Sequence, residues 1–146
     1  MFTNILVALD GSTVSRQALI ETVDLARLMN ARMHAVHVME TVASALNTRD
    51  RPIGMDTLEL YSLLEKEGKN ILDEAKKYCA DNGITVTPHL TQGDAGTEII
   101  SVSEQEKCDL IVVGSYGKSG FNRLFLGSVS SFVVKNTKVS TMVVRA

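Results

Sequence analysis

Cysteine is scarce in this chain of 146 residues: Cys79 and Cys108 are the only two, and no C-x-x-C pair occurs. The scarcity excludes a small disulfide-stapled domain and a cysteine-based zinc site, and it fits a reducing cytoplasm. No apolar run approaches the roughly 20 residues that cross a bilayer. The first residues also lack the basic start and the apolar stretch of a leader peptide. We therefore expect a cytoplasmic protein that has no membrane partner.

Clusters of basic residues are also missing. Lysine and arginine never occur more than two in a row, and the formal net charge is −2. Proteins that bind nucleic acids usually carry a basic stripe or patch, so we expect no nucleic-acid partner. A chain of 146 residues suffices for one domain with its own core but is too short for two ordinary ones. We expect a single domain over residues 1–146.

Short apolar runs alternate with longer amphipathic segments along the chain, which predicts buried strands alternating with helices. The expected strands cover 3–9, 34–39, 84–90, 110–113 and 139–144, and the expected helices cover 12–30, 55–81, 93–107 and 129–135. Residues 40–54 are poorly periodic and predict no regular element, with an exposed loop at 49–52. Because strands alternate with helices, their pairing should be parallel with right-handed crossovers. The fold class is therefore α/β: one doubly wound parallel sheet with helices on both faces.

Glycines near the C-terminal end form a pattern that suggests a phosphate site. Gly114-Ser115-Tyr116-Gly117 follows an apolar run, and Gly127-Ser128 comes after nine further residues, directly before a helical stretch. Glycine lets backbone N–H groups approach an anion, and the first turn of a helix offers unpaired donors at the positive end of its dipole. A strand that leads through such a loop into a helix therefore predicts a nucleotide site at the carboxyl edge of the sheet.

Two familiar phosphate-binding loops do not fit. The pattern G-x-G-x-x-G is absent after the first strand, where Asp10-Gly11-Ser12 stands instead. Gly117-Lys118-Ser119 resembles the end of a Walker A loop, but only Ser115 and Tyr116 separate it from Gly114. That loop needs four residues there to wrap a phosphate.

The observed spacing, G-x2-G-x9-G-[S/T], resembles that of the ATP-binding branch of the universal stress protein family. The order of elements, Asp10 after the first strand and the Gly93-Asp94 turn are also similar, so the resemblance covers the whole chain. It implies an adenine nucleotide alpha hydrolase-like fold with five strands in the order 3-2-1-4-5, and pairing as a homodimer. Tyr116 departs from the family, in which many members carry His or another polar residue there.

The resemblance also implies which residues meet the nucleotide. The ligand it implies is ATP, with Mg²⁺ carried on the phosphates. The implied contacts are Ala8, Leu9, Asp10 and Val38 for the base, Val113 and Gly114 for the ribose, and Gly117, Gly127, Ser128 and Val129 for the phosphates.

Some polar candidates have a second interpretation. Asp10 could cap the first helix instead of contacting the base or a metal. Ser128 could be only an N-cap, although an N-cap serine and a phosphate ligand use the same geometry. Lys118 and Arg123 are either solvated loop charges or residues that neutralise the triphosphate.

The histidines do not predict a metal site. His34 and His37 are three residues apart in a strand, so their side chains should face opposite sides of the sheet. His89 is isolated at a strand end. We therefore expect no metal ion held by protein side chains.

Two functions fit these observations. The resemblance implies a nucleotide-dependent regulatory or stress-response protein, and the alternative is an ATPase or nucleotidyl-transferring enzyme of the same fold. Hydrolysis needs a residue that directs a water molecule, and residues 114–135 contain no carboxylate. We expect slow turnover or self-phosphorylation at most, and no catalytic residue is assigned.

The last strand predicts how the chain associates. The order of strands that the resemblance implies places residues 139–144 at a sheet edge, where open backbone groups need a partner or a cover. An antiparallel twin from a second copy would satisfy them and form a C2 dimer.

Overall fold

The computed structural model describes residues 1–48, 54–117 and 126–145. Lys118, Arg123 and the segment 49–52 lie outside the described residues. The strands are β1 (Asn4–Ala8), β2 (Arg32–Met39), β3 (Val86–Gln92), β4 (Leu110–Gly114) and β5 (Ser140–Val144). The helices are α1 (Thr13–Met29), α2 (Val42–Thr48), α3 (Thr57–Asp81), α4 (Ala95–Gln105) and α5 (Ser128–Asn136). Within these ranges, no helix combines the length and the apolar character that a membrane span requires.

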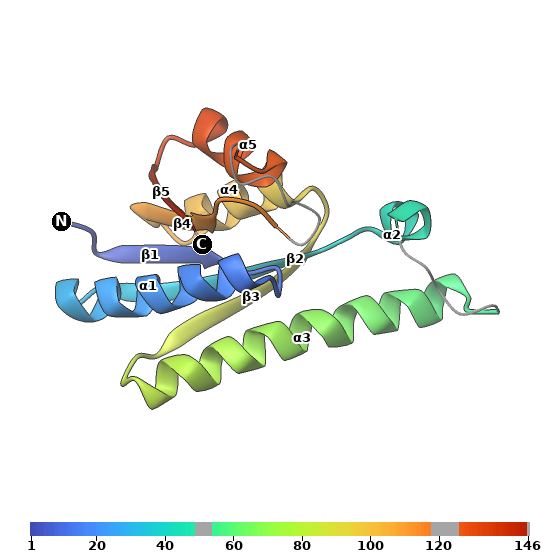
Figure 1. The fold of residues 1–146 in the computed structure, drawn as a ribbon, viewed down its shortest axis with the longest axis horizontal. Helices are drawn as coiled ribbons and strands as arrows, with labels where there is room; N and C mark the ends of the chain where they lie inside the picture. Colours follow the sequence, from blue (N-terminus) through green and yellow to red (C-terminus); the bar gives the residue numbers. More distant parts are fainter. Residues whose placement is uncertain (49–53, 118–125, 146) are drawn as a thin grey trace.

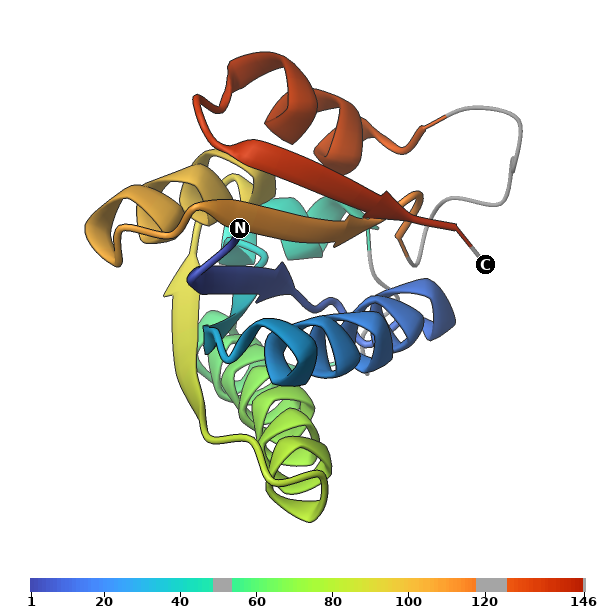
Figure 2. The ribbon, with the colours of Figure 1, turned by 90° about the vertical axis from the view of Figure 1, so that its left-hand side faces the viewer.

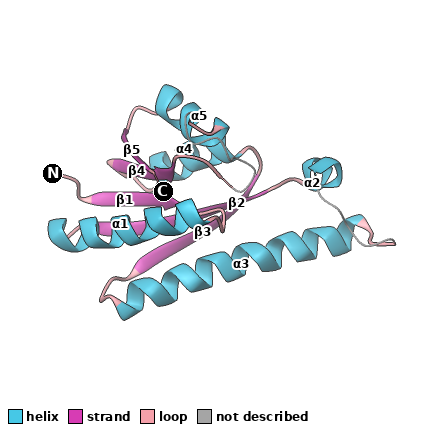
Figure 3. Cartoon of the chain, in the orientation of Figure 1, coloured by secondary structure: helices cyan, strands magenta, loops and turns pink. Residues whose placement is uncertain are grey.

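The five strands form one parallel sheet in the order β3-β2-β1-β4-β5. This confirms the expected doubly wound α/β fold and its strand order. Helices α1 and α3 cover one face, and α4 and α5 cover the other, while α2 lies beyond the end of β2 (Figure 1). The view along the sheet shows β5 at one edge and β3 at the other (Figure 2). The alternation of helix and strand along the chain is interrupted once, where α2 and α3 follow each other (Figure 3).

The sheet separates two apolar cores. In the central strand β1, Ile5 and Val7 pack in the cluster under α1 and α3, and Leu6 packs in the cluster under α4 and α5. All three side chains are fully buried. A strand covered on both faces reads as a continuous apolar run rather than an alternating one. This explains why the first strand was easy to predict.

Some boundaries differ from those expected. β2 begins at Arg32 instead of 34, and β3 covers Val86–Gln92 instead of 84–90. The pairing with β2, from Met33–Val86 to Met39–Gln92, sets the extent of β3. Ile84 lies outside the strand because its N–H donates to the Cys79 carbonyl, 2.8 Å away, at the end of α3.

The short helix α2 was not predicted. Its Ala45 is fully buried and packs against Leu60 and Leu64 of α3. Seven residues give almost no periodic signal, and isolated helices of this length are unstable in water. Packing against α3 therefore decides that α2 forms.

Candidate functional site

A cavity of about 400 Å³ opens at the carboxyl ends of the strands. Pockets that hold small ligands typically have volumes of roughly 300–1,000 Å³. The strand order reverses between β1 and β4, whose crossover helices leave toward opposite faces of the sheet. Ligands of doubly wound folds bind at this point, because the segments that follow the strands separate there and leave a crevice.

All of the predicted site residues that the structure describes line this one cavity. They are Ala8, Leu9, Asp10, Val38, Val113, Gly114, Gly117, Gly127, Ser128 and Val129. The structure thus brings together four segments that are separate in the sequence. Whether these residues hold a ligand stays a prediction.

The N-terminus of α5 borders the cavity without a capping side chain. Its N-cap is Gly127, which makes no side-chain hydrogen bond, so Ser128 is the first helical residue and is not the cap. The first intrahelical bond runs from the N–H of Ser131 to the Gly127 carbonyl. The N–H groups of the three residues before Ser131 therefore have no partner within the helix. These donors and the helix dipole favour an anion at this end of the cavity.

Tight contacts hold the glycine loop in place. The N–H of Gly127 donates to the Ser115 carbonyl at 2.6 Å, and the Ser130 hydroxyl donates to the same carbonyl at 3.1 Å. A Cβ atom on Gly127 would lie 3.0 Å from the Tyr116 Cα, and one on Gly117 would lie 2.6 Å from an Asp10 carboxylate oxygen. These glycines therefore serve the packing of the loop itself, in addition to any ligand.

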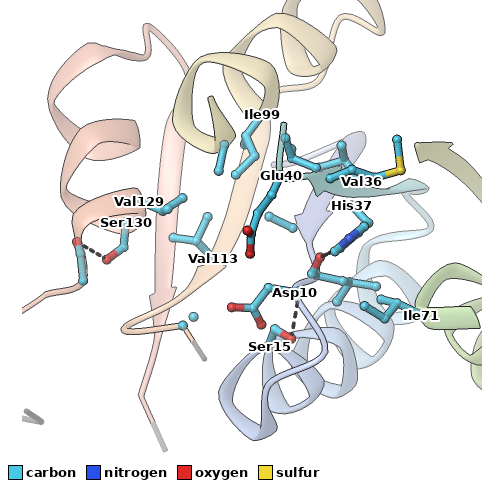
Figure 4. Close-up of a pocket in the computed structure, with 18 of the residues that line it drawn as sticks. Asp10, Ser15, Val36, His37, Glu40, Ile71, Ile99, Val113, Val129 and Ser130 are labelled. Carbon is cyan, nitrogen blue, oxygen red and sulfur yellow. Dashed lines mark hydrogen bonds between the residues drawn. The ribbon is translucent and has the colours of Figure 1, made fainter. Parts of the chain in front are cut away.

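Asp10 is directed into the cavity and does not cap α1. The cap is Ser12, whose hydroxyl accepts from the N–H of Ser15 at 3.1 Å. One Asp10 carboxylate oxygen accepts from the N–H of Ser12 at 2.9 Å, which fixes the turn after β1. Figure 4 shows the carboxylates of Asp10 and Glu40 both pointing into the cavity.

The end of β2 offers backbone groups at the cavity wall. The register between β1 and β2 ends at Ala8–Val36, followed by one bond of 2.9 Å from the N–H of Leu9 to the Val36 carbonyl. The Leu9 carbonyl accepts a hydrogen bond from Nδ1 of His37 at 2.7 Å. Two residues beyond Val36, Val38 points its backbone groups to the same side and has no β1 residue opposite it in the register. Val38 is one of the residues that the family resemblance implies for contact with the base.

Several cavity residues escaped the sequence analysis, among them His37, Glu40 and Glu67. Glu40 directly follows β2, so the rule that ligands lie at the carboxyl edge could have found it. Glu67 comes from the middle of α3, and no local signal marks it, because only the packing of α3 brings it to the cavity.

The described lining combines acidic, neutral polar and apolar side chains. Asp10, Glu40 and Glu67 contribute carboxylates, and no lysine or arginine lines the cavity within the part of the chain that the structure describes. A phosphate chain bound here would need a cation to offset these charges. Apolar side chains such as Val36, Ile71 and Ile99 form surfaces on which a flat base could pack.

One expectation about the histidines is wrong. His89 is not isolated, because its Nε2 lies 3.0 Å from Nδ1 of His34 on the neighbouring strand. His37 faces the other side of the sheet, as expected, and contacts Leu9.

Comparison with known proteins decides the family. The family model described as Universal stress protein family matches residues 1–145. The chain belongs to the universal stress protein family. The universal stress protein YxiE of Bacillus subtilis is 33% identical over 151 residues, which cover 99% of this chain and 100% of that protein.

Solved structures of universal stress proteins share the fold. The protein MJ0577 of Methanocaldococcus jannaschii superposes with a TM-score of 0.83 at 28% identity, covering 100% of this chain and 97% of that one. A universal stress protein family protein of Arabidopsis thaliana, solved with AMP bound, superposes with a TM-score of 0.71. It is 20% identical, and the match covers 98% of this chain and 91% of that one, so this likeness concerns the fold.

Proposed function

We propose that this chain binds ATP with Mg²⁺ at the carboxyl edge of its sheet and acts in the cytoplasm as a nucleotide-dependent regulatory protein of a stress response. The observation that carries the proposal is the N-terminus of α5, which has no capping side chain and whose first N–H groups, without a partner in the helix, border a cavity of suitable size. Family membership supports the stress-response setting, and no single residue encodes it.

The base would lie between the ends of β1 and β2. Val38 offers backbone groups there that have no β1 partner in the register. An adenine ring carries both a donor and an acceptor on one edge, so such a strand end can recognise it. Apolar side chains on both sides would cover the faces of the ring, and the AMP-bound Arabidopsis protein supports an adenine nucleotide as ligand.

The phosphates would bind the first turn of α5 and the glycine loop. Gly117 and Gly127 place no side chain over the loop, and the exposed Ser128 adds a hydroxyl. The carboxylates of Asp10 and Glu40 fit Mg²⁺, which prefers oxygen ligands and commonly bridges carboxylates to phosphates. When bound, the ion would offset the charge of the phosphates against these acidic side chains.

Calorimetry with purified protein tests the ligand. ATP should bind at about one equivalent per chain, more weakly without Mg²⁺, whereas GTP should bind far more weakly. At one hundred times the dissociation constant, ligand binding stabilises a fold by about 2.7 kcal/mol. For a domain of this size, this raises Tm by roughly 5–10 °C. Equal affinity for ATP and GTP would contradict the assignment of the base, and no binding at millimolar ATP would contradict the whole proposal.

An enzymatic role is the second candidate. The glycine loop has no carboxylate of its own, yet Asp10, Glu40 and Glu67 bring three to the cavity from other segments. A carboxylate can orient a water molecule, which supports slow ATP hydrolysis. Multiple-turnover release of ADP would favour the enzyme, and bound ATP that stays intact over hours would favour the regulatory role.

We also propose a homodimer through β5. This strand pairs with β4 on one side and lies at the edge of the sheet. Its other side can pair with a second copy. Sedimentation equilibrium should show a dimer at about 10 µM, and a monomer at that concentration would contradict the proposal.

A further inference from the structure

A second group of polar side chains lies away from the nucleotide cavity. His34 of β2, His89 of β3 and Glu106 at the end of α4 each offer one ligand atom, and these atoms all lie within 4.8 Å of one another. None of the three lines the cavity at the carboxyl edge. The cluster sits on the face of the sheet that α4 covers, toward the start of β2.

The strand register creates the cluster. Thr87 is opposite His34, and His89 is opposite Val36, so both histidine side chains stand on the same face of the sheet. Helix α4 runs antiparallel to the strands, and its C-cap residue is Glu106. The Asn4 amide donates to the Glu106 carbonyl at 2.7 Å and fixes the backbone there. Three separate elements thus hold the three groups in place.

The distances are within about 1.5 Å of those between ligands of one metal ion. His34 Nδ1 lies 3.0 Å from His89 Nε2 and 4.0 Å from Glu106 Oε2. Ligand atoms about 2.0–2.1 Å from a tetrahedral Zn²⁺ are roughly 3.3 Å apart. The three atoms lie within 4.8 Å of one another, so side-chain shifts on the order of 1 Å would bring all three to one ion.

The electrostatic surroundings favour a cation on balance. Burial, together with the nearby His89 ring, lowers the pKa of His34 and so disfavours a positive charge on this imidazole. Glu106 contributes a negative charge, and the C-terminal end of the α4 dipole adds to it. Arg32 is a nearby cation that opposes binding, but its side chain is exposed and its charge is therefore screened.

We infer that His34, His89 and Glu106 form a zinc site. Two imidazoles and one carboxylate are a donor set that Zn²⁺ takes, with a water molecule in the fourth position. The side chain of His34 is 10% exposed and that of Glu106 is 39% exposed, so one side of the site is open to water and to an entering ion. Without a metal, the two rings share a hydrogen bond.

Nuclear magnetic resonance of the imidazole nitrogens tests the site in the unaltered, tag-free protein. The chain has three histidines, so His37 is an internal control. One equivalent of Zn²⁺ should shift Nδ1 of His34 and Nε2 of His89 and leave His37 unchanged. A spectrum that does not change at 100 µM free Zn²⁺, or one in which His37 shifts instead, would overturn the inference.

Calorimetry with variants adds a second measurement. His89→Gln should weaken Zn²⁺ binding at least about tenfold, since even residues that only support metal ligands are worth that much. Glu106→Gln should weaken it several-fold. Glu104→Gln is the matched control, because it removes an exposed carboxylate two positions away on the same segment. If His89→Gln and Glu106→Gln both bound Zn²⁺ as tightly as the wild type, the zinc site would be wrong. This result would not depend on whether ATP binds at the cavity.

Discussion

The N-termini of α4 and α5 lie on the same face of the sheet and border the same cavity, yet they treat their free N–H groups differently. At α4, an Asp94 carboxylate oxygen accepts from the N–H of Thr97 at 3.0 Å and from its hydroxyl at 2.7 Å. At α5, the corresponding position is Gly127, which has no side chain. The N-terminus of α4 is thus capped by a carboxylate of the chain itself, whereas the N-terminus of α5 has no side chain in the corresponding position.

The same contrast separates α5 from α1 and α3. Ser12 caps α1 and Asp56 caps α3, each through its side chain. A capping side chain is typically worth about 1 kcal/mol. Glycine at the N-cap costs only a few tenths of a kcal/mol relative to such a residue, so α5 loses little stability and has no side chain at this position. The comparison teaches that helix ends at one cavity can differ in whether their first N–H groups have a side-chain partner, and the proposed phosphate site depends on this difference.

The largest effect is expected when the N-terminus of α5 is given a carboxylate of its own, as α4 has. Ser128→Asp puts a carboxylate in the first turn, where it should favour the helix dipole and leave the ligand-free protein no less stable. It should repel the phosphates and weaken ATP binding at least about tenfold, or about 1.4 kcal/mol. Calorimetry measures the affinity, and thermal unfolding without ATP measures the stability.

Ser62→Asp on α3 is the matched control, because this serine is exposed and does not line the cavity. It should leave the affinity unchanged. A substitution of Gly127 is less suitable, because a Cβ atom there would lie 3.0 Å from the Tyr116 Cα and could disturb the loop. If Ser128→Asp bound ATP as tightly as the wild type, α5 would not hold the phosphates.

Removing the internal anion of α4 should have a smaller effect, on stability alone. Asp94→Ala leaves the first turn of α4 uncapped and should lower the free energy of unfolding by about 1 kcal/mol, or Tm by roughly 3 °C. ATP affinity should stay within about twofold. Asp56→Ala removes a similar cap from α3 and should cost a similar amount. A large loss of ATP affinity in Asp94→Ala would show that the two helix ends do not have separate roles.

The smallest expected effect is a pH dependence of the α4 cap. The hydrogen bonds from Thr97 lower the pKa of Asp94 below its ordinary value of 3.8. Because the folded state lowers this pKa, the cap stabilises the protein fully above pH 3.8, and the contribution is lost as pH falls through the lower, folded-state pKa. Chemical denaturation at several pH values should show the wild type and Asp94→Ala converging below about pH 3.8. A difference that stays constant to pH 2 would contradict this.

Much of the site was predictable because it depends on local signals. The glycine spacing marks the loop after β4, and the apolar runs mark the strands whose carboxyl ends must meet at one edge. Asp10 and Val38 follow from the same rule. The sequence does not decide whether Ser128 or Gly127 is the N-cap of α5, because both residue types are common at this position. The backbone geometry shows that the N-cap is Gly127.

The order of strands and helices, and the loop that leads into α5, come from the sequence by itself, because periodicity and glycine spacing act over a few residues. Only the tertiary structure decided that Glu40 and Glu67 line the cavity at the carboxyl edge and that α2 forms. It also brought His34 to His89, which is 55 residues away in the chain. The physical reason is that contacts between neighbouring strands depend on their register, and packing across the whole sheet sets that register.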